Sequence, residues 1–206
     1  MDKEQLLANC RTASLICNPE SKILRDWAPE CFVNIFGNLI LGKVFCDVGC
    51  GAGGLVLSAS RFADTSIGVD IIDELEPLNW SFFDNESRKC YSVLLQYFKD
   101  PITNTKVKFS TDVLKSGMPD ADFYLLNLPK DIIIDALDLV EAKDFEHIAV
   151  VVPKWESYLD EELNSRLLKR GYEIKTFDDI CGFTRLLAFK SRNSYIKLDD
   201  IEWRID

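Results

Sequence analysis

Residues 45–54, FCDVGCGAGG, combine a carboxylate with a cluster of glycines. Asp47 lies in an apolar run, and four of the chain's ten glycines follow it closely, at positions 49, 51, 53 and 54. Glycine lets a backbone turn sharply and approach a ligand closely. The first N–H groups of a helix that follows such a turn face the same ligand. The segment therefore predicts a nucleotide-type site where a first strand passes into a helix.

The glycine spacing fits two ligand templates, and Asp47 favours one of them. Gly49, Gly51 and Gly54 match the dinucleotide pattern G-x-G-x-x-G, whereas Asp47, Gly49, Gly51 and Gly53 match an acid followed by three alternating glycines. A dinucleotide brings its pyrophosphate to this helix end, where a carboxylate would repel it. S-adenosylmethionine carries no phosphate, and its ammonium and sulfonium groups are cations. These residues favour S-adenosylmethionine; the alternative is a structural turn in which Asp47 caps the helix.

Two further carboxylates follow later strand candidates. Asp70 closes the segment SIGVD, and Asp112 follows KVKFST. A carboxylate at the end of the second strand accepts hydrogen bonds from ribose hydroxyls, so Asp70 supports a nucleoside ligand under either template. Asp112 is placed to meet an adenine amino group or, equally, to serve as a turn residue.

The segments around these residues alternate between strand and helix patterns. Strands are predicted at 43–49, 65–71, 105–112, 121–129, 147–153, 172–180 and 183–191, with helices at 53–63, 131–142 and 158–170 among them. Such alternation predicts an α/β fold with a parallel sheet covered by helices on both faces. The short connection at Gly182 makes the last two strands an antiparallel pair. Residues 1–42 are predicted to form a helical extension or lid, 43–191 the main domain, and 192–206 a tail.

Four segments resemble the class I S-adenosylmethionine-dependent methyltransferases. They are DVGCGAGG (47–54), GVDI (68–71), FSTDVL (109–114) and ADFYLLNLP (121–129). The resemblance implies a Rossmann-like three-layer sandwich whose seven-stranded sheet has the order 3-2-1-4-5-7-6, with the last strand antiparallel. It also implies S-adenosylmethionine as the cofactor.

The resemblance also assigns roles to residues. Asp47, Gly49, Gly51 and Gly53 would line the methionyl side, Asp70 would hold the ribose, and Asp112 would lie by the adenine. Cys50, a small side chain between two of the glycines, and Ile71 complete the predicted cofactor residues. Asn127 would lie next to the reacting methyl group, and it is the predicted catalytic residue together with Pro129.

The acceptor is predicted from the residues that end the fourth strand and from the layout of residues 68–127. Residues 127–130, NLPK, lack the second proline and the aromatic residue of methyltransferases that act on adenine, cytosine or glutamine amides. The layout of residues 68–127 is similar to Dot1-like lysine methyltransferases, which indicates N-methylation of a protein lysine. The candidate walls of the acceptor channel are Asn127, Leu128, Pro129, Trp155 and the aromatic residues of 79–83.

Composition indicates which partners the protein binds and in which compartment it is found. The formal net charge is −10, and an acidic surface repels phosphate backbones while it attracts basic protein segments. This favours a basic protein substrate and makes nucleic-acid binding depend on a helper subunit. Seven cysteines without a C-x-x-C pair predict reduced thiols and no metal site. No apolar run reaches the roughly 18 residues that span a bilayer, so an intracellular, cytoplasmic location is expected.

Three other functions stay open on this evidence. The first is a methyltransferase for RNA, with a partner subunit, or for a small molecule. The second is a catalytically silent homologue that binds the nucleoside and acts as a scaffold. The third, an NAD-dependent dehydrogenase, is disfavoured because it would need a further catalytic domain, and the chain has one histidine. That histidine, His147, begins an apolar run and is predicted to be structural.

Overall fold

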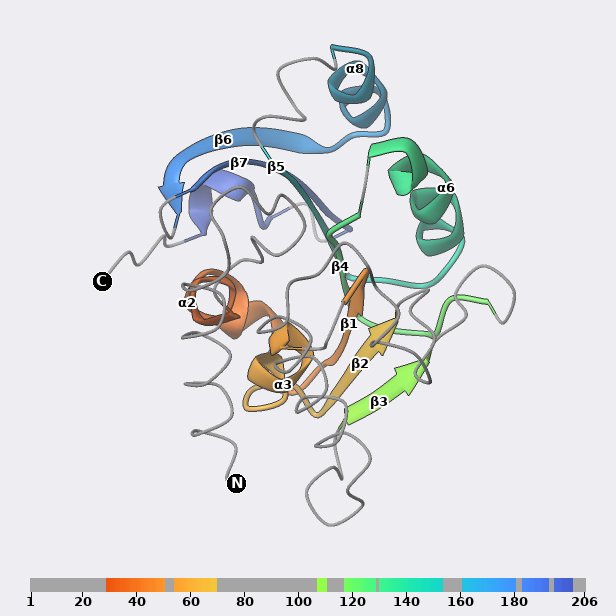
Figure 1. Ribbon diagram of the computed structural model, residues 1–206, viewed down its shortest axis with the longest axis vertical. Coiled ribbons are helices and arrows are strands. Elements are labelled where there is room, and N and C mark those ends of the chain that lie inside the picture. Colours follow the sequence, from red (N-terminus) through yellow and green to blue (C-terminus); the bar gives the residue numbers. More distant parts are fainter. Residues whose placement is uncertain are drawn as a thin grey trace, which may run out of the picture.

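The computed structural model describes residues 29–50, 54–69, 107–110, 117–128, 130–153, 161–180, 183–192 and 195–201. In these ranges a twisted sheet runs through the middle of the molecule, and helices lie on both of its faces (Figure 1). The strands are β1 (Val44–Val48), β2 (Thr65–Val69), β3 (Val107–Ser110), β4 (Phe123–Leu126), β5 (His147–Pro153), β6 (Glu173–Ile180) and β7 (Phe183–Ser191). The helices are α2 (Pro29–Ile40), α3 (Gly54–Ala59), α6 (Lys130–Glu141), α8 (Glu161–Lys169) and the short 3₁₀ helix η2 (Leu198–Asp200).

The strand order confirms the predicted sheet. Seven strands are arranged as β3-β2-β1-β4-β5-β7-β6. The pairs β3–β2, β2–β1, β1–β4 and β4–β5 are parallel, whereas β7 runs antiparallel to both β5 and β6. β1 is an interior strand, and its Cys46 lies between Ile67 of β2 and Tyr124 of β4. The carboxyl ends of β1, β2 and β4 therefore meet at one edge of the sheet, called the carboxyl edge below.

The middle strands of the sheet are buried on both faces, which explains the continuous apolar runs of β4 and β5. Alternate residues of β5 enter two different clusters: Ile148 and Val150 join the cluster that contains α6 and α8, and Ala149 and Val151 join the cluster that contains α2. In the second cluster the ring of Phe36 lies 5.5 Å from that of Phe123. The apolar run 147–153 is thus a strand that needs a cover on each side.

The two terminal segments contribute to the second cluster. In α2, the side chains of Ile35, Phe36 and Ile40 are buried there. At the other end of the chain, Leu198 and Ile201 are buried in the same cluster. Parts of both the predicted extension and the predicted tail therefore cover the sheet, while the predicted divisions at 42 and 191 stay predictions.

Helix α3 is shorter than the predicted 53–63, because it ends at Ala59. Beyond Ala59 the chain turns tightly and is tied to the loop before β1. Gly42 donates its N–H to the carbonyl of Phe62 at 3.1 Å, and Asp64 donates to that of Lys43 at 3.0 Å. These bonds set the level at which β2 starts beside β1, so the helix cannot continue through residue 63.

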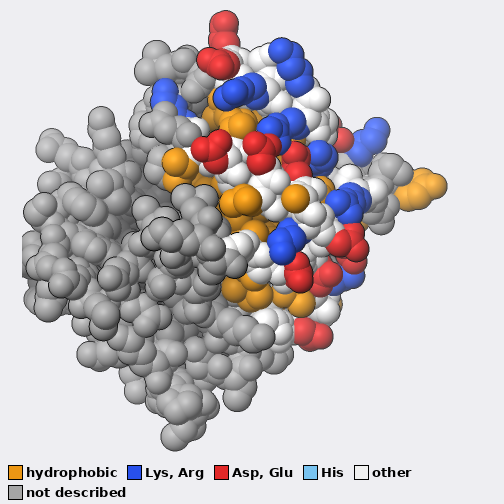
Figure 2. All heavy atoms as spheres, turned by 90° about the vertical axis from the view of Figure 1, so that its right-hand side faces the viewer, with side chains coloured by type: hydrophobic (Ala, Val, Ile, Leu, Met, Phe, Trp, Pro, Cys, Tyr) orange, Lys and Arg blue, Asp and Glu red, His pale blue; other side chains and the backbone are white. Residues whose placement is uncertain are grey.

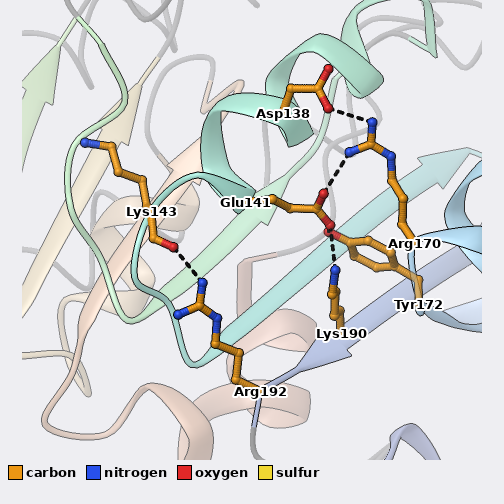
Figure 3. Close-up of polar contacts among 7 residues, drawn as sticks. All are labelled: Asp138, Glu141, Lys143, Arg170, Tyr172, Lys190 and Arg192. Atoms are coloured by element: carbon orange, nitrogen blue, oxygen red, sulfur yellow. Dashed lines mark hydrogen bonds and ion pairs between the residues drawn. The ribbon is translucent and has the colours of Figure 1, made fainter.

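A polar network ties the end of α6 to β7 and to the connection between α8 and β6, at the opposite, amino edge of the sheet (Figure 3). One oxygen of Glu141 accepts from Arg170 at 2.7 Å, and the other accepts from Lys190 at 2.8 Å and from the Tyr172 hydroxyl at 3.1 Å. Arg170 also donates to Asp138 at 2.6 Å. Burial, followed by the nearby Glu141 charge, raises the pKa of Tyr172, so its hydroxyl stays protonated and donates. The face around α6 accordingly shows basic and acidic side chains next to each other (Figure 2).

Glu141→Ala is expected to lower the free energy of unfolding by about 1–3 kcal/mol. The Glu141 side chain is 19% exposed, and its loss leaves two partly buried cations without this partner, a larger effect than the loss of an exposed pair. Urea denaturation at pH 7 measures the change. Asp144→Ala is the matched control, since Asp144 pairs with Arg192 but is fully exposed. Equal effects of the two substitutions would contradict the structural role given to Glu141.

His147 is buried, as the prediction of a structural role requires. Its ring lies 5.7 Å from that of Phe123 and 5.8 Å from that of Phe189. Burial lowers the pKa of His147, the nearby charge of Glu146 opposes this shift, and Lys43 adds to it. Nδ1 has no hydrogen-bond partner in the described part of the chain. The neutral imidazole is therefore the form that the folded protein favours.

The stability of the protein is expected to fall as the pH drops below the ordinary histidine pKa of about 6.5. In that range the unfolded chain takes up a proton at His147 that the folded chain does not, so the unfolded state is favoured. For one proton the slope is at most about 1.4 kcal/mol per pH unit. Urea denaturation at pH 7.5 and 5.5 measures it. His147→Leu should flatten this dependence, and an unchanged slope in the variant would assign the effect to other groups.

Candidate functional site

The carboxyl edge is built by hydrogen bonds that join the ends of three strands. Gly49 and Cys50, directly after β1, both donate to the carbonyl of Val69, the last residue of β2, at 2.8 and 3.2 Å. Asn127, directly after β4, donates to the carbonyl of Val48 at 3.1 Å. The turn after β1 is therefore held from both neighbouring strands. These bonds bring the predicted site residues Gly49, Cys50 and Asn127 together.

Glycine is the one residue type that fits at position 49. Its φ is +84°, in the left-handed region where glycine carries no Cβ penalty. A Cβ at this position would lie 2.6 Å from the backbone oxygen of Asn127 and 2.5 Å from Cδ2 of Leu128. The glycine is thus required twice, by its dihedral angle and by the close approach of the chain after β4. The sequence predicts a close approach to a ligand, whereas at Gly49 the approach seen is to Asn127 and Leu128.

Asp47 is buried within β1, one residue before the strand ends. Its exposed fraction is 2%. In the parallel ladder it lies level with Gly68 of β2 and Leu125 of β4, so glycine contributes no side chain beside it on the β2 side. Burial chiefly, and then the Asp47 charge, raises the pKa of the neighbouring Cys46 thiol. In these surroundings, of low effective dielectric, the carboxylate interacts more strongly with a cation than it would in water.

The remaining predicted site residues divide into two groups. Cys50 is buried and Asn127 is half-buried, both at the carboxyl edge. Six predicted residues lie outside the described residues: Gly51, Gly53, Asp70, Ile71, Asp112 and Pro129. Trp155 and the aromatic residues of 79–83 lie outside them as well. The roles given to all of these residues stay predictions.

Two features at this edge are missing from the sequence-based account. One is Gly68, whose position in the middle of a strand pattern is itself a signal, because glycine in a strand often marks a close approach. The other is the contact of Leu128 with Gly49, which joins residues far apart in the chain and leaves no local signal. The sequence predicts Leu128 only as a wall of the acceptor channel.

Among the described residues, no group of three or more His, Cys, Asp or Glu side chains is placed to hold a metal ion. Within the same residues, no helix has both the length and the apolar character that crossing a membrane requires.

Comparison with solved structures identifies the fold. The ribosomal protein L11 methylase from Lactobacillus delbrueckii subsp. bulgaricus matches with a TM-score of 0.54 and 14% identity, over 78% of this chain and 76% of that one. The magnesium protoporphyrin IX methyltransferase from Synechocystis PCC 6803, solved with bound S-adenosylmethionine, matches with a TM-score of 0.54 and 15% identity, over 93% of this chain and 98% of that one. The fold is that of the class I S-adenosylmethionine-dependent methyltransferases.

A third structure with this methyltransferase fold comes from a protein described by a different substrate. It is a putative RNA methyltransferase from Pyrococcus horikoshii, with a TM-score of 0.52, 15% identity and coverage of 92% of this chain and 98% of that one. No protein-family model matches the sequence, and no curated protein matches it significantly. The methyltransferase fold is therefore established through structure, and the similarity to Dot1-like enzymes stays a prediction.

Proposed function

We propose that this protein is an S-adenosylmethionine-dependent methyltransferase that methylates the amine nitrogen of a protein lysine. The observation that carries the proposal is the buried Asp47 carboxylate two residues before the obligatory glycine at position 49. In a methyltransferase fold this pair lies at the carboxyl edge, where ligands of open α/β sheets bind. A buried carboxylate there suits a ligand with cationic groups and disfavours a pyrophosphate.

The residues present fit S-adenosylmethionine. Asp47 would attract its ammonium group, Gly49 would let the chain turn beside it, and Gly51 and Gly53 would let the backbone come close to it. Asp70 and Ile71 would hold the ribose and Asp112 the adenine, while Cys50 is small enough to lie in the turn. When bound, S-adenosylmethionine would supply a methyl group on a sulfonium sulfur, and transfer of that methyl to a nitrogen would leave the sulfur as the thioether of S-adenosylhomocysteine.

The chain's own part in the reaction is to bind and to position. Charge is dispersed in such a displacement, so alignment and exclusion of water supply most of the acceleration. A lysine amine has a pKa of ~10.4 in water and must lose a proton before it attacks. An apolar entry favours the neutral amine, and Leu128 and Pro129 are apolar. The side-chain carbonyl of Asn127 would accept a hydrogen bond from the amine and orient it.

The choice of a protein as the acceptor rests on charge, and the choice of its lysine rests on the layout of residues 68–127. With a net charge of −10, the protein attracts basic protein segments and repels free RNA. The structural neighbours include a methylase of ribosomal protein L11, a putative RNA methyltransferase and a porphyrin methyltransferase. The fold thus accommodates acceptors of each class, and the charge favours a protein.

Transfer of a labelled methyl group into a cell lysate tests the proposal. The purified protein is incubated with labelled S-adenosylmethionine and lysate, and the product is treated with protease or RNase. Label that is lost with protease and recovered as methyllysine supports the proposal. Label lost with RNase would replace the lysine assignment by RNA. Binding of the donor without any transfer would indicate a silent scaffold.

Asn127→Ala is expected to lower turnover by roughly 100-fold, the usual cost of removing one positioned polar group, while donor affinity stays within about twofold. The reason is that Asn127 is assigned to the acceptor and Asp47 to the donor. Single-turnover rates measured beside donor titrations separate the two. Asn164→Ala is the control, since Asn164 is similarly half-buried but lies on α8. Unchanged turnover in Asn127→Ala would remove that residue from the site.

A further inference from the structure

Leu128 lies against the glycine turn from the β4 side. Its Cδ2 atom is 2.5 Å from the point that a Cβ of Gly49 would occupy, so it fills the space beside the glycine. Its backbone is fixed by its neighbours, because Asn127 donates to Val48 at 3.1 Å and α6 begins at Lys130. The half-buried Leu128 side chain also packs against the larger core cluster. Leu128 is therefore held from behind by the core and meets the turn in front.

The same turn is held from the other side by β2. Both N–H groups at Gly49 and Cys50 are bound to the carbonyl of Val69. These bonds oppose a shift of the turn away from β2, but a hydrogen bond can lengthen by a few tenths of an ångström before it breaks. On the β4 side the Asn127 backbone and the Leu128 side chain block the same shift by direct contact. Of these two, only the side chain can be removed by substitution.

We propose that Leu128 is a positioning residue, whose side chain holds the Gly49 turn in place for the methyl donor. This inference rests on the proposed function, because it concerns binding of the donor. Without the Leu128 side chain, Gly49 has room to shift, because it has no Cβ of its own to fill the space. A shift of about 1 Å at such a turn is enough to impair binding and alignment. Leu128 also joins the turn directly to Asn127, so the donor and acceptor sides are kept in register.

The test compares variants of two half-buried leucines that pack against the same core cluster. Leu128→Ala removes the contact with Gly49, and Leu128→Val, which lacks δ carbons, removes the same contact with less loss of packing. Leu139→Ala, on α6, is the matched control for core packing. Leu128→Met restores a side chain of similar volume and reach. S-adenosylhomocysteine is the ligand, measured by calorimetric titration, and the melting temperature of each ligand-free variant is recorded.

We expect Leu128→Ala and Leu128→Val to bind S-adenosylhomocysteine about tenfold more weakly than the wild type. Leu139→Ala and Leu128→Met should stay within twofold, even where the melting temperature falls. If the Leu128 variants lose no more affinity than Leu139→Ala at similar melting temperatures, the positioning role is overturned while the proposed function stands. If the wild type itself binds neither S-adenosylmethionine nor S-adenosylhomocysteine, the proposed function is overturned, and the role of Leu128 with it.

Discussion

Gly49→Ala is expected to lower the free energy of unfolding by about 2–5 kcal/mol and to abolish measurable binding of S-adenosylhomocysteine. Two costs add up. A residue with a Cβ at a φ of +84° carries roughly 1–2 kcal/mol of strain. The new Cβ would also overlap the backbone of Asn127 and the side chain of Leu128, and such overpacking costs about 1–3 kcal/mol. Denaturant unfolding and calorimetric titration measure the two effects.

Gly171→Ala separates the two costs. Gly171 follows α8 with a φ of +83°, but nothing lies within 4 Å of the position its Cβ would take. Its substitution should therefore show the strain alone, about 1–2 kcal/mol, with ligand affinity unchanged. If Gly49→Ala destabilises the protein no more than Gly171→Ala does, the close packing of the turn against the end of β4 does not exist in solution.

Asp47→Asn is expected to weaken binding of S-adenosylmethionine by roughly 30–100-fold. The substitution keeps the shape of the side chain and removes its charge, so it deletes the attraction to the ammonium group. A charge-assisted interaction of this kind contributes about 2–3 kcal/mol when it is shielded from water. Because the side chain is 2% exposed, solvent screens little of this interaction. Titration with the donor measures the loss, and the shape of the variant side chain keeps the fold intact.

Asp122→Asn provides the comparison for Asp47. Asp122 lies just before β4 at the amino edge, where its Oδ2 accepts from the N–H of Val44 at 2.8 Å. Its substitution should leave donor affinity within twofold. A similar loss in both variants would mean that net charge, and not the position of Asp47, governs binding. An Asp47→Asn variant with wild-type affinity would remove this carboxylate from the donor site.

The sheet was predictable because its strands carry a strong signal. A run such as His147–Pro153 is apolar at nearly every position, as a strand covered on both faces must be. The alternation of such runs with amphipathic segments indicates the parallel core, and the short connection at Gly182 indicates the antiparallel end. The strand order came from the resemblance to methyltransferases, since periodicity says nothing about which strands are neighbours.

Features set by tertiary contact were not predictable in the same way. The end of α3 at Ala59 depends on hydrogen bonds between the residues that follow it and the loop before β1: Phe62 accepts from Gly42, and Asp64 donates to Lys43. No local pattern encodes these bonds. Likewise the sequence pattern of the apolar stripe of α2 is the same whether the helix covers a sheet or closes over a ligand. Only the packing of Phe36 against Phe123 and Phe189 shows that it covers the sheet.

In the candidate site, too, features with a local sequence signal were predictable and features set by tertiary contact were not. Residue types and spacing were enough to single out Asp47 and Gly49, because the acid lies in an apolar run and glycines follow it at alternate positions. They were not enough to find Leu128 at the turn, because that contact bridges β1 and β4. The structure also shows that Gly49 is required by the protein's own packing, which the sequence could not distinguish from approach to a ligand.

Hydrogen–deuterium exchange with and without saturating S-adenosylhomocysteine tests the central claim most directly. If the carboxyl edge binds the donor, the ligand should slow exchange in residues 46–50 and 126–128 and leave the amino edge at 141–147 unchanged. NAD at the same concentration should have no effect. Absence of protection at 46–50, or protection there by NAD and not by S-adenosylhomocysteine, would contradict the assignment of this edge to a methyl donor.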